Sequence, residues 1–284
     1  MAEVPGTTTT NGKEVGDDGK EKVIILSGAS RGIGLSTAHY LLSHSHKLVL
    51  ISRSHAALDQ LHYQYGSDRV EVLAGDLSDD SLKLPERAVD LAVSRWGRVD
   101  ALVVNHGTLE PVGKIADVEV DEWRKGFGVN VFGAVGLIRA AIPSLRTTKG
   151  RIILVSSGAA ISAYQGWGPY GASKAVLNHV ATTLAVEEPL ITTLSIRPGV
   201  VDTEMQREIR EVHVDKMSAK DGEKFLGLKV SGGLLKPELP GGVIARLCVE
   251  DGAVEGGKGV EGLSGRFLSW NDGLLEAFQG EGSS

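Results

Sequence analysis

The stretch Ser27-Gly28-Ala29-Ser30-Arg31-Gly32-Ile33-Gly34 follows the apolar run Val23–Leu26 and precedes a segment with apolar residues at helical spacing. Glycines let a backbone turn tightly and approach a pyrophosphate, and the free amides at a helix start attract negative charge. The spacing is Gly-x3-Gly-x-Gly, and the Gly-Lys-Ser/Thr of a P-loop is missing. The stretch therefore predicts a dinucleotide-binding turn; the alternative, a tight packing turn, is weakened by the strand before it and the helix after it.

Short apolar, β-branched runs alternate with longer amphipathic segments along most of the chain. The predicted strands are Val23–Leu26, Leu48–Ser52, Val70–Leu73, Ala101–Val104, Ile152–Val155, Thr193–Ile196 and Phe267–Ser269. Apolar strands linked by helices are typical of a parallel sheet that is covered on both faces. The sequence predicts an α/β, single-domain Rossmann fold with a doubly wound, seven-stranded parallel sheet and helices on both faces.

Two helices between these strands have a clear apolar face. Leu35, Ala38, Leu41 and Leu42 form one face, and Ala88, Leu91, Ala92 and Trp96 form another. Gly97 follows the second face and predicts a left-handed helix end.

The domain boundaries follow from composition. Residues 1–22 carry threonines and scattered charges without an apolar pattern, and predict a disordered N-terminal tail. Residues 23–275 form the predicted domain, and residues 204–240 within it read as one or two amphipathic helices, a predicted substrate lid. Residues 251–262, rich in glycine and charge, predict a surface loop, and residues 276–284 predict a flexible C-terminus.

Composition excludes several classes of function. The 284 residues carry a net charge of −6, whereas a nucleic-acid-binding domain normally has a basic surplus. The longest apolar runs are far too short to span a bilayer, and the N-terminal segment lacks the apolar core of a signal peptide. The single cysteine, Cys248, suits a reducing compartment, and His44 and His46 lack a third ligand at metal-binding spacing. We expect a cytoplasmic protein with no nucleic acid, membrane or metal partner.

The end of the second predicted strand, Ile51-Ser52-Arg53-Ser54, indicates which dinucleotide binds. A fold that prefers NAD usually carries an acid about 20 residues past the glycines, which binds the ribose 2′-hydroxyl. Here no acid appears before Asp59. Arg53, together with Arg31 from the glycine turn, can pair with a 2′-phosphate instead. We therefore predict NADP(H); the alternative is that both arginines are solvated surface residues.

Polar residues also follow the third and fourth strands. Asp76 and Leu77 come directly after the third strand, where Asp76 and the neighbouring backbone can hold an adenine ring. Asn105, His106 and Gly107 follow the fourth strand, at the carboxyl edge where such sheets bind ligands.

The fifth strand leads to the residues that carry chemistry. It ends in Ser156-Ser157, and Tyr170 and Lys174 follow with a spacing of four, which places them on one face of a helix. We expect the Lys174 ammonium to lower the pKa of Tyr170, so that its phenol takes part in proton transfer. Ser157 can donate a hydrogen bond to a substrate carbonyl as negative charge develops on its oxygen.

These motifs together resemble the short-chain dehydrogenase/reductase family over residues 22 to 275. The resemblance rests on the glycine turn, Asp76, Asn105-His106-Gly107, Asn130, Ser157, Tyr170, Lys174 and Arg197-Pro198-Gly199. It implies that Tyr170 is the general acid for carbonyl reduction, or the base for alcohol oxidation. Lys174 would hold the nicotinamide ribose, Ser157 would orient the carbonyl, and Asn130 would bend its helix and hold a water in a proton relay. Motifs and resemblance together imply the cofactor-binding residues Gly28, Ser30, Arg31, Gly32, Ile33, Gly34, Arg53, Asp76, Leu77, Asn105, Gly107, Tyr170, Lys174, Pro198, Gly199, Val201 and Thr203.

A finer resemblance concerns the substrate. The stretches around Val155, Tyr164, Asn178 and Pro198–Gln206 are similar to those of fungal benzil reductases, which are related to sepiapterin reductases. This implies that a vicinal diketone or similar bulky carbonyl compound binds near Tyr164, Trp167 and Met205. The alternative is that these three side chains are ordinary core or lid packing.

Two departures from the family pattern follow. His106 stands where the family usually has Ala, and we interpret it as a packed neighbour that makes one hydrogen bond; the alternative is a contact with the substrate or the nicotinamide. Gly126, Gly128, Gly133 and Gly136 lie in a predicted helix, where each costs about 1 kcal/mol relative to Ala. Either close packing, including packing across a subunit interface, compensates for them, or this helix is less stable than its pattern indicates.

The leading hypothesis is an NADPH-dependent carbonyl reductase for a ketone or vicinal diketone. One alternative is an NADP-dependent alcohol dehydrogenase that acts in the oxidative direction, and the other is a non-catalytic NADP-sensing regulatory protein. Because the family commonly pairs subunits through the helices that carry Asn130 and Tyr170, the resemblance implies a homodimer or homotetramer.

Overall fold

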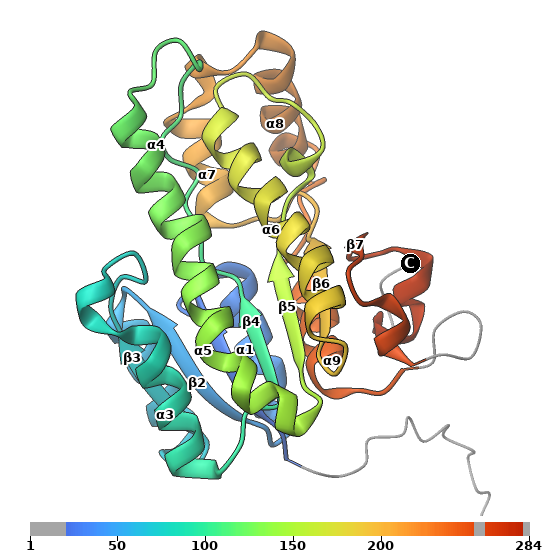
Figure 1. Cartoon of the computed structure of the whole chain (residues 1–284). Helices are drawn as coiled ribbons and strands as arrows, with labels where there is room; N and C mark the ends of the chain where they lie inside the picture. The colour runs from blue at the N-terminus through green and yellow to red at the C-terminus, as the bar shows by residue number, and fades with distance from the viewer. Residues whose placement is uncertain (1–20, 253–258, 281–284) are drawn as a thin grey trace, which may run out of the picture.

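The computed structural model describes residues 21–252 and 259–280 (Figure 1). A parallel sheet of seven strands in the order β3-β2-β1-β4-β5-β6-β7 forms its centre. The strands are β1 Val23–Ser27, β2 Lys47–Ser52, β3 Val70–Ala74, β4 Ala101–Val104, β5 Arg151–Val155, β6 Thr192–Arg197 and β7 Phe267–Ser269. Each predicted strand is confirmed to within one residue at either end, and the predicted fold class is confirmed.

Helices cover both faces of the sheet, as a doubly wound fold requires. They are α1 Gly32–Ser43, α2 His55–Tyr65, α3 Leu84–Trp96, α4 Val120–Phe127, α5 Gly133–Thr148, α6 Gly168–Glu187, α7 Glu204–Glu211, α8 Ala219–Val230 and α9 Glu238–Val249. Side chains of α1, α2 and α9 pack on one face, and those of α3, α5 and α6 pack on the other. The strand order reverses between β1 and β4, and at such a point the strand ends diverge and leave a crevice for ligands.

The amphipathic patterns explain the helices nearest the sheet. Ala38, Leu41 and Leu42 of α1 are fully buried, as the spacing predicts. In α3, Ala88 and Ala92 face the sheet, and Leu91 and Trp96 pack at the edge of the same core. This helix ends at Gly97 with φ +77°, the left-handed conformation that was predicted for it.

The glycine-rich helix is interrupted. A π-helical turn, Gly128–Phe132, separates α4 from α5 and carries Asn130. An added Cβ would lie 2.9 Å from the Glu110 carbonyl oxygen at Gly126, and 3.1 Å from the Leu77 side chain at Gly133. Close packing within the chain therefore accounts for these two glycines. The run Val120–Thr148 is long and apolar enough to span a membrane by composition, but 44% of its apolar window is buried inside the fold.

The predicted boundaries need correction at several points. Residues 1–20 of the predicted tail, 253–258 of the predicted loop and 281–284 of the predicted C-terminus lie outside the described residues. Glu21 does not belong to a disordered tail, because its carboxylate pairs with the Lys47 ammonium at 2.6 Å. Val260–Leu263 is a short 3-10 helix with both end residues buried, so that the predicted loop is wrong there. The prediction of a flexible end from residue 276 is wrong for Glu276–Phe278, because Phe278 is fully buried.

Candidate active site

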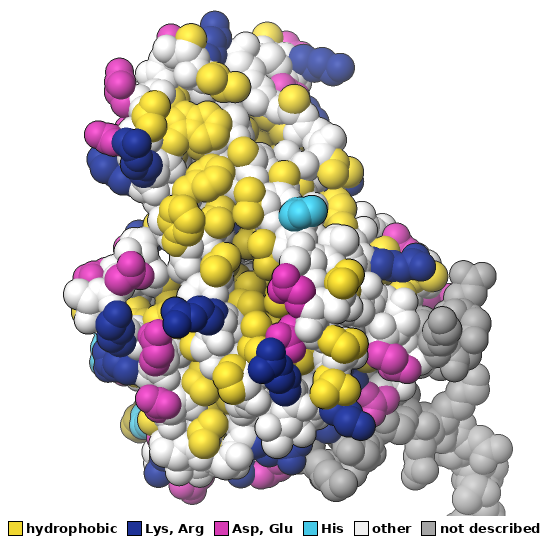
Figure 2. All heavy atoms as spheres, in the orientation of Figure 1, with side chains coloured by type: hydrophobic (Ala, Val, Ile, Leu, Met, Phe, Trp, Pro, Cys, Tyr) yellow, Lys and Arg dark blue, Asp and Glu magenta, His cyan; other side chains and the backbone are white. Residues whose placement is uncertain are grey.

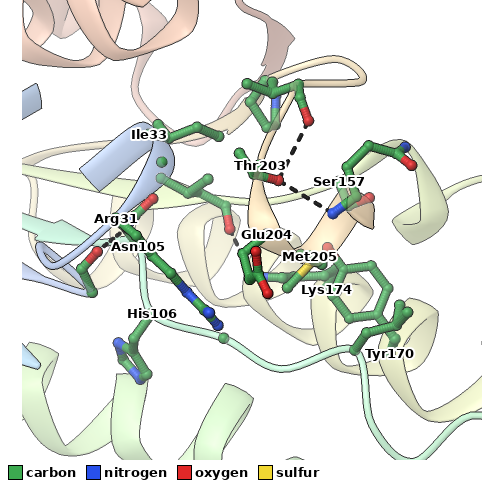
Figure 3. Close-up of a pocket in the computed structure, with 18 of the residues that line it drawn as sticks. Arg31, Ile33, Asn105, His106, Ser157, Tyr170, Lys174, Thr203, Glu204 and Met205 are labelled. Carbon is green, nitrogen blue, oxygen red and sulfur yellow. Dashed lines mark hydrogen bonds between the residues drawn. The ribbon is translucent and has the colours of Figure 1, made fainter. Parts of the chain in front are cut away.

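A cavity of about 510 Å³ opens at the carboxyl ends of the strands. It runs from the β1–α1 turn to α7 and α8, and its volume lies within the range of small-molecule sites. All of the predicted site residues except Gly34 and Asn130 line it. Figure 3 shows Arg31 and Asn105 on one side of this cavity and Ser157, Tyr170 and Lys174 on the other. Residues that are far apart in the sequence thus share one site.

The β1–α1 turn needs its glycines for steric reasons. Gly28 and Gly32 have φ values of +69° and +56°, which strain other residues. An added Cβ at Gly34 would lie 2.2 Å from the Gly28 carbonyl oxygen, so this glycine supports the turn from beneath. The Asn105 amide donates a hydrogen bond to the same carbonyl at 2.9 Å. Gly28 and Gly32 bring the backbone of the turn to the cavity wall, and this fits a bound pyrophosphate.

Arg53, which follows β2, supplies positive charge to the cavity. Arg53 lines the cavity and makes no hydrogen bond or ion pair with any residue that the structure describes. Arg31 faces the Glu208 carboxylate at 4.0 Å. Burial opposes ionisation of Asp76, but two hydrogen bonds from Ser78 and the charge of Arg53 hold the pKa of this carboxyl below its usual value. An unpaired guanidinium here fits a phosphate on the adenosine ribose.

The predicted catalytic side chains are brought together at the other side of the cavity. Tyr170 and Lys174 share one face of α6 and are 8% and 4% exposed. The Lys174 ammonium donates to the Val155 carbonyl oxygen at 2.8 Å and lies 5.9 Å from the centroid of the Tyr170 ring. Ser157 lies at the end of β5, where its hydroxyl accepts a hydrogen bond from the Ala159 amide at 3.1 Å.

The predicted effect of Lys174 on Tyr170 is wrong for this structure. Burial raises the pKa of the Tyr170 phenol above its usual value, and the hydrogen bond with Ser157 offsets only part of this increase. Burial also lowers the pKa of the Lys174 ammonium to about 8. Removal of water destabilises both the Tyr170 phenolate and the Lys174 ammonium. A spacing of four residues therefore does not by itself lower the pKa of the phenol. The phenol therefore keeps its proton at neutral pH.

Asn130 does not reach the cavity. Its side-chain oxygen accepts from the Thr108 amide at 2.8 Å, and its amide donates to the Thr108 carbonyl oxygen at 2.9 Å and to the Ser173 hydroxyl at 3.0 Å. The π-helical turn that contains it matches the predicted bend. In this arrangement the side chain positions the loop after β4 against α6, and the predicted water-holding role stays a prediction.

His106 makes two hydrogen bonds and not the single one that we expected. Its Nε2 lies 3.1 Å from the Val129 carbonyl oxygen, which can only accept, so Nε2 carries the proton. Its Nδ1 then accepts from the Ser27 hydroxyl at 2.7 Å. The ring therefore connects the start of the glycine turn to the π-helical turn. Burial, with the nearby Lys174 charge, lowers the pKa of His106 to about 4.

This low pKa predicts a loss of stability in mild acid. Between about pH 6.5 and pH 4 the unfolded chain binds a proton at His106 that the folded chain does not, so stability falls as the pH falls through this window. We expect His106→Gln, which cannot titrate, to remove about 3 kcal/mol of this pH dependence. Urea unfolding of both proteins at several pH values measures the effect. The exposed His44 serves as the control position, and a slope that changes equally in His44→Gln contradicts the assignment.

The three predicted substrate residues line the apolar end of the cavity. The rings of Tyr164 and Trp167 lie 4.8 Å apart, and Trp167 meets Tyr170 edge to face at 6.0 Å. Phe225 of α8 stacks on Trp167 at 5.4 Å and was not predicted from the sequence. The sequence of α8 predicts an apolar face, but nothing in the sequence shows which residues this face packs against. The predicted lid segment consists of α7, a short 3-10 helix, α8 and the first turn of α9, and its Met205, Ile209 and Phe225 close the apolar end.

Comparisons with known proteins agree with the fold. The family model described as short chain dehydrogenase matches residues 22–213. An uncharacterized oxidoreductase of Saccharomyces cerevisiae is 40% identical over 261 residues, covering 90% of this chain and 98% of its own. The crystal structure of that yeast protein aligns with a TM-score of 0.84 over 91% of this chain and 100% of its own.

A further yeast protein and a second yeast crystal structure are similar to this chain over most of their length. The (S)-benzoin-forming benzil reductase of Saccharomyces cerevisiae is 36% identical over 271 residues, which is 91% of this chain and 99% of that protein. The structure described as a cytoplasmic yeast protein of unknown function has 38% identity and a TM-score of 0.74, over 91% of this chain and 100% of its own. Short-chain dehydrogenases use nicotinamide cofactors. The chain belongs to the short-chain dehydrogenase family, and it is an oxidoreductase.

Proposed function

We propose that this protein is an NADPH-dependent carbonyl reductase for ketones and vicinal diketones. The observation that carries the proposal is that Ser157, Tyr170 and Lys174 lie in the same cavity as the glycine turn and the unpaired Arg53. One cavity thus combines a predicted binding site for the dinucleotide with a predicted proton donor, Tyr170. In this proposal the partner is a small carbonyl compound, and the enzyme works in the cytoplasm.

The residues that would hold the cofactor extend across the sheet edge. The turn around Gly28 receives the pyrophosphate, Arg53 and Arg31 the 2′-phosphate, Asp76 the adenine side, and Lys174 the nicotinamide ribose. Pro198, Gly199, Val201 and Thr203 line the cavity next to the chemical residues, where a nicotinamide would lie. When bound, the cofactor supplies the hydride.

Tyr170 supplies the proton. Burial raises the pKa of the Tyr170 phenol, so the phenol is protonated at neutral pH and has a proton to donate. In this proposal Ser157 donates to the carbonyl oxygen and stabilises the charge that develops on it. Because the same group accepts the proton in the reverse reaction, the rates in both directions decide between carbonyl reduction and the alternative, alcohol oxidation.

The substrate class follows from the apolar end of the cavity. Tyr164, Trp167 and Phe225 form an aromatic wall beside Tyr170. Flat aromatic ketones fit such a wall, and the yeast benzil reductase shares more than a third of its residues with this chain. Benzil is therefore the first substrate to test.

Initial rates at neutral pH test this proposal against its two alternatives. We expect rapid NADPH oxidation with benzil, slower oxidation of NADH, and slower reduction of NADP⁺ with benzoin. Faster oxidation of benzoin would instead support the alcohol dehydrogenase. Tight NADPH binding without turnover of any carbonyl or alcohol would support the sensing protein.

We also propose that two copies pair through α5 and α6. Val135, Ile138, Ile142 and Val180 line a shallow groove between these helices. Figure 2 shows apolar side chains gathered along this face of the molecule, and Phe132 at the start of α5 is 66% exposed. Light scattering should give the mass of a dimer or tetramer, and Val135→Glu should shift it toward the monomer. A monomeric wild-type protein at micromolar concentration contradicts this assembly.

A further inference from the structure

Arg197 is a second unpaired cation in the cavity, and the mechanism above does not use it. It is the last residue of β6, directly before Pro198 and Gly199, and its exposed side chain lines the cavity. The guanidinium makes no hydrogen bond or ion pair with any residue that the structure describes. An arginine that lines a cavity without a partner is available to a ligand.

Gly158 places this guanidinium beside the catalytic serine. Gly158 follows Ser157 and also lines the cavity. An added Cβ at Gly158 would lie 3.0 Å from Nε, 3.1 Å from Cζ and 3.2 Å from Nη2 of Arg197. The guanidinium therefore occupies the space that a side chain at position 158 would fill, one residue from Ser157.

The other charged groups of the cavity do not neutralise Arg197. Arg53 and Arg31 lie at the end that would hold the 2′-phosphate, and Lys174 donates to a backbone carbonyl. Glu204 also lines the cavity, and its carboxylate pairs with Arg207. Positive charge thus remains unbalanced where the substrate would bind.

We propose that Arg197 binds a carboxylate on the substrate, so that the preferred substrates are aromatic ketones that carry a carboxylate. The planar guanidinium matches a carboxylate in a two-point hydrogen-bonded pair, and the aromatic wall takes the ring. This inference rests on the proposed function, because it concerns the same site and the same reaction. It adds recognition of charge to the apolar contacts that benzil alone would use.

Acid and ester pairs test the charge directly. Benzoylformate, 3-benzoylpropionate and 4-benzoylbutyrate are compared with their methyl esters, because the series varies the separation between carbonyl and carboxylate. For the best acid we expect kcat/KM to exceed that of its ester. In Arg197→Leu the acid-to-ester ratio should fall about 10- to 100-fold, as expected for a lost charge-assisted hydrogen bond. Arg197→Lys should keep part of the ratio.

The control variant removes an arginine that lies outside the cavity. Arg266 is exposed, precedes β7 at the amino end of that strand and does not line the cavity, whereas Arg197 lies at the carboxyl end of the neighbouring β6. Arg266→Leu therefore makes the same change in net charge and should leave the acid-to-ester ratio unchanged. An acid-to-ester ratio that is the same in the wild type and in Arg197→Leu overturns the inference. If neutral ketones are still reduced in that case, the proposed function stands alone.

Binding measured without turnover distinguishes a failure of the proposed reaction from a failure of the proposed anion site. Quenching of tryptophan fluorescence follows benzoylformate, 3-benzoylpropionate and 4-benzoylbutyrate as each binds to the protein saturated with NADP⁺. For the tightest of the three, we expect Arg197→Leu and added salt each to weaken binding. If every ketone fails as a substrate but one acid binds through Arg197, the proposed reaction is wrong and the anion site is correct. If none of the acids binds in either protein, the anion site is wrong.

Discussion

Tyr170→Phe is expected to lower kcat for carbonyl reduction by about a thousandfold or more, which is within the range for loss of a general acid. The substitution removes the proton donor and keeps the ring that packs at 6.0 Å against Trp167. We therefore expect unchanged folding and nearly unchanged NADPH binding. Measurement of kcat at saturating NADPH, with binding followed separately by fluorescence, tests this expectation.

The matched control for Tyr170→Phe is Tyr164→Phe. Tyr164 lies in the same aromatic wall, but its hydroxyl pairs with Lys224 at 3.2 Å and not with the catalytic set. Its loss should change KM more than kcat. A Tyr170→Phe enzyme that keeps near-wild-type kcat would show that another group donates the proton.

Arg53→Asp is expected to reverse the preference for the phosphorylated cofactor. A carboxylate repels the 2′-phosphate and can accept a hydrogen bond from a ribose 2′-hydroxyl. We expect the ratio of kcat/KM for NADPH to that for NADH to fall about 100-fold or more, since an attractive charge is replaced by a repulsive one. The change should appear mainly in KM.

Direct titration of each nucleotide measures the same preference without turnover. Arg266→Asp makes the same change of charge outside the cavity and controls for long-range attraction of the anionic cofactor. Equal weakening of NADPH and NADH by Arg53→Asp would remove the basis for assigning NADP(H).

The sheet and the nucleotide end were predictable because their signals are local. The glycines between Ser27 and Gly34 follow a strand directly, and their positive φ values and close contacts leave no room for other residues. The apolar runs of a parallel sheet are buried on both faces, so that composition alone marks them. The positive charge of Arg53 after β2 can be read from the sequence without knowing how the rest of the chain folds.

The parts that failed depend on tertiary contacts. Sequence spacing places Lys174 beside Tyr170 but does not show that burial raises the pKa of the phenol. The family resemblance implies a bend at Asn130, but the helical pattern alone does not reveal the π-helical turn. In that turn Asn130 accepts a hydrogen bond from the amide of Thr108, which lies in another loop. The stacking of Phe225 on Trp167 and the close approach of Arg197 to Gly158 join segments that are distant in the sequence.

The central claim is that hydride passes from NADPH to a substrate carbonyl while Tyr170 protonates the oxygen. The most direct measurement uses NADPH deuterated at both C4 positions, benzil as the substrate, and mass spectrometry of the product at neutral pH, where the carbinol hydrogen of benzoin exchanges slowly. The account predicts benzoin with a single deuterium on the carbinol carbon, and none from Tyr170→Phe within the same time. Unchanged benzil, or benzoin without deuterium, would contradict it.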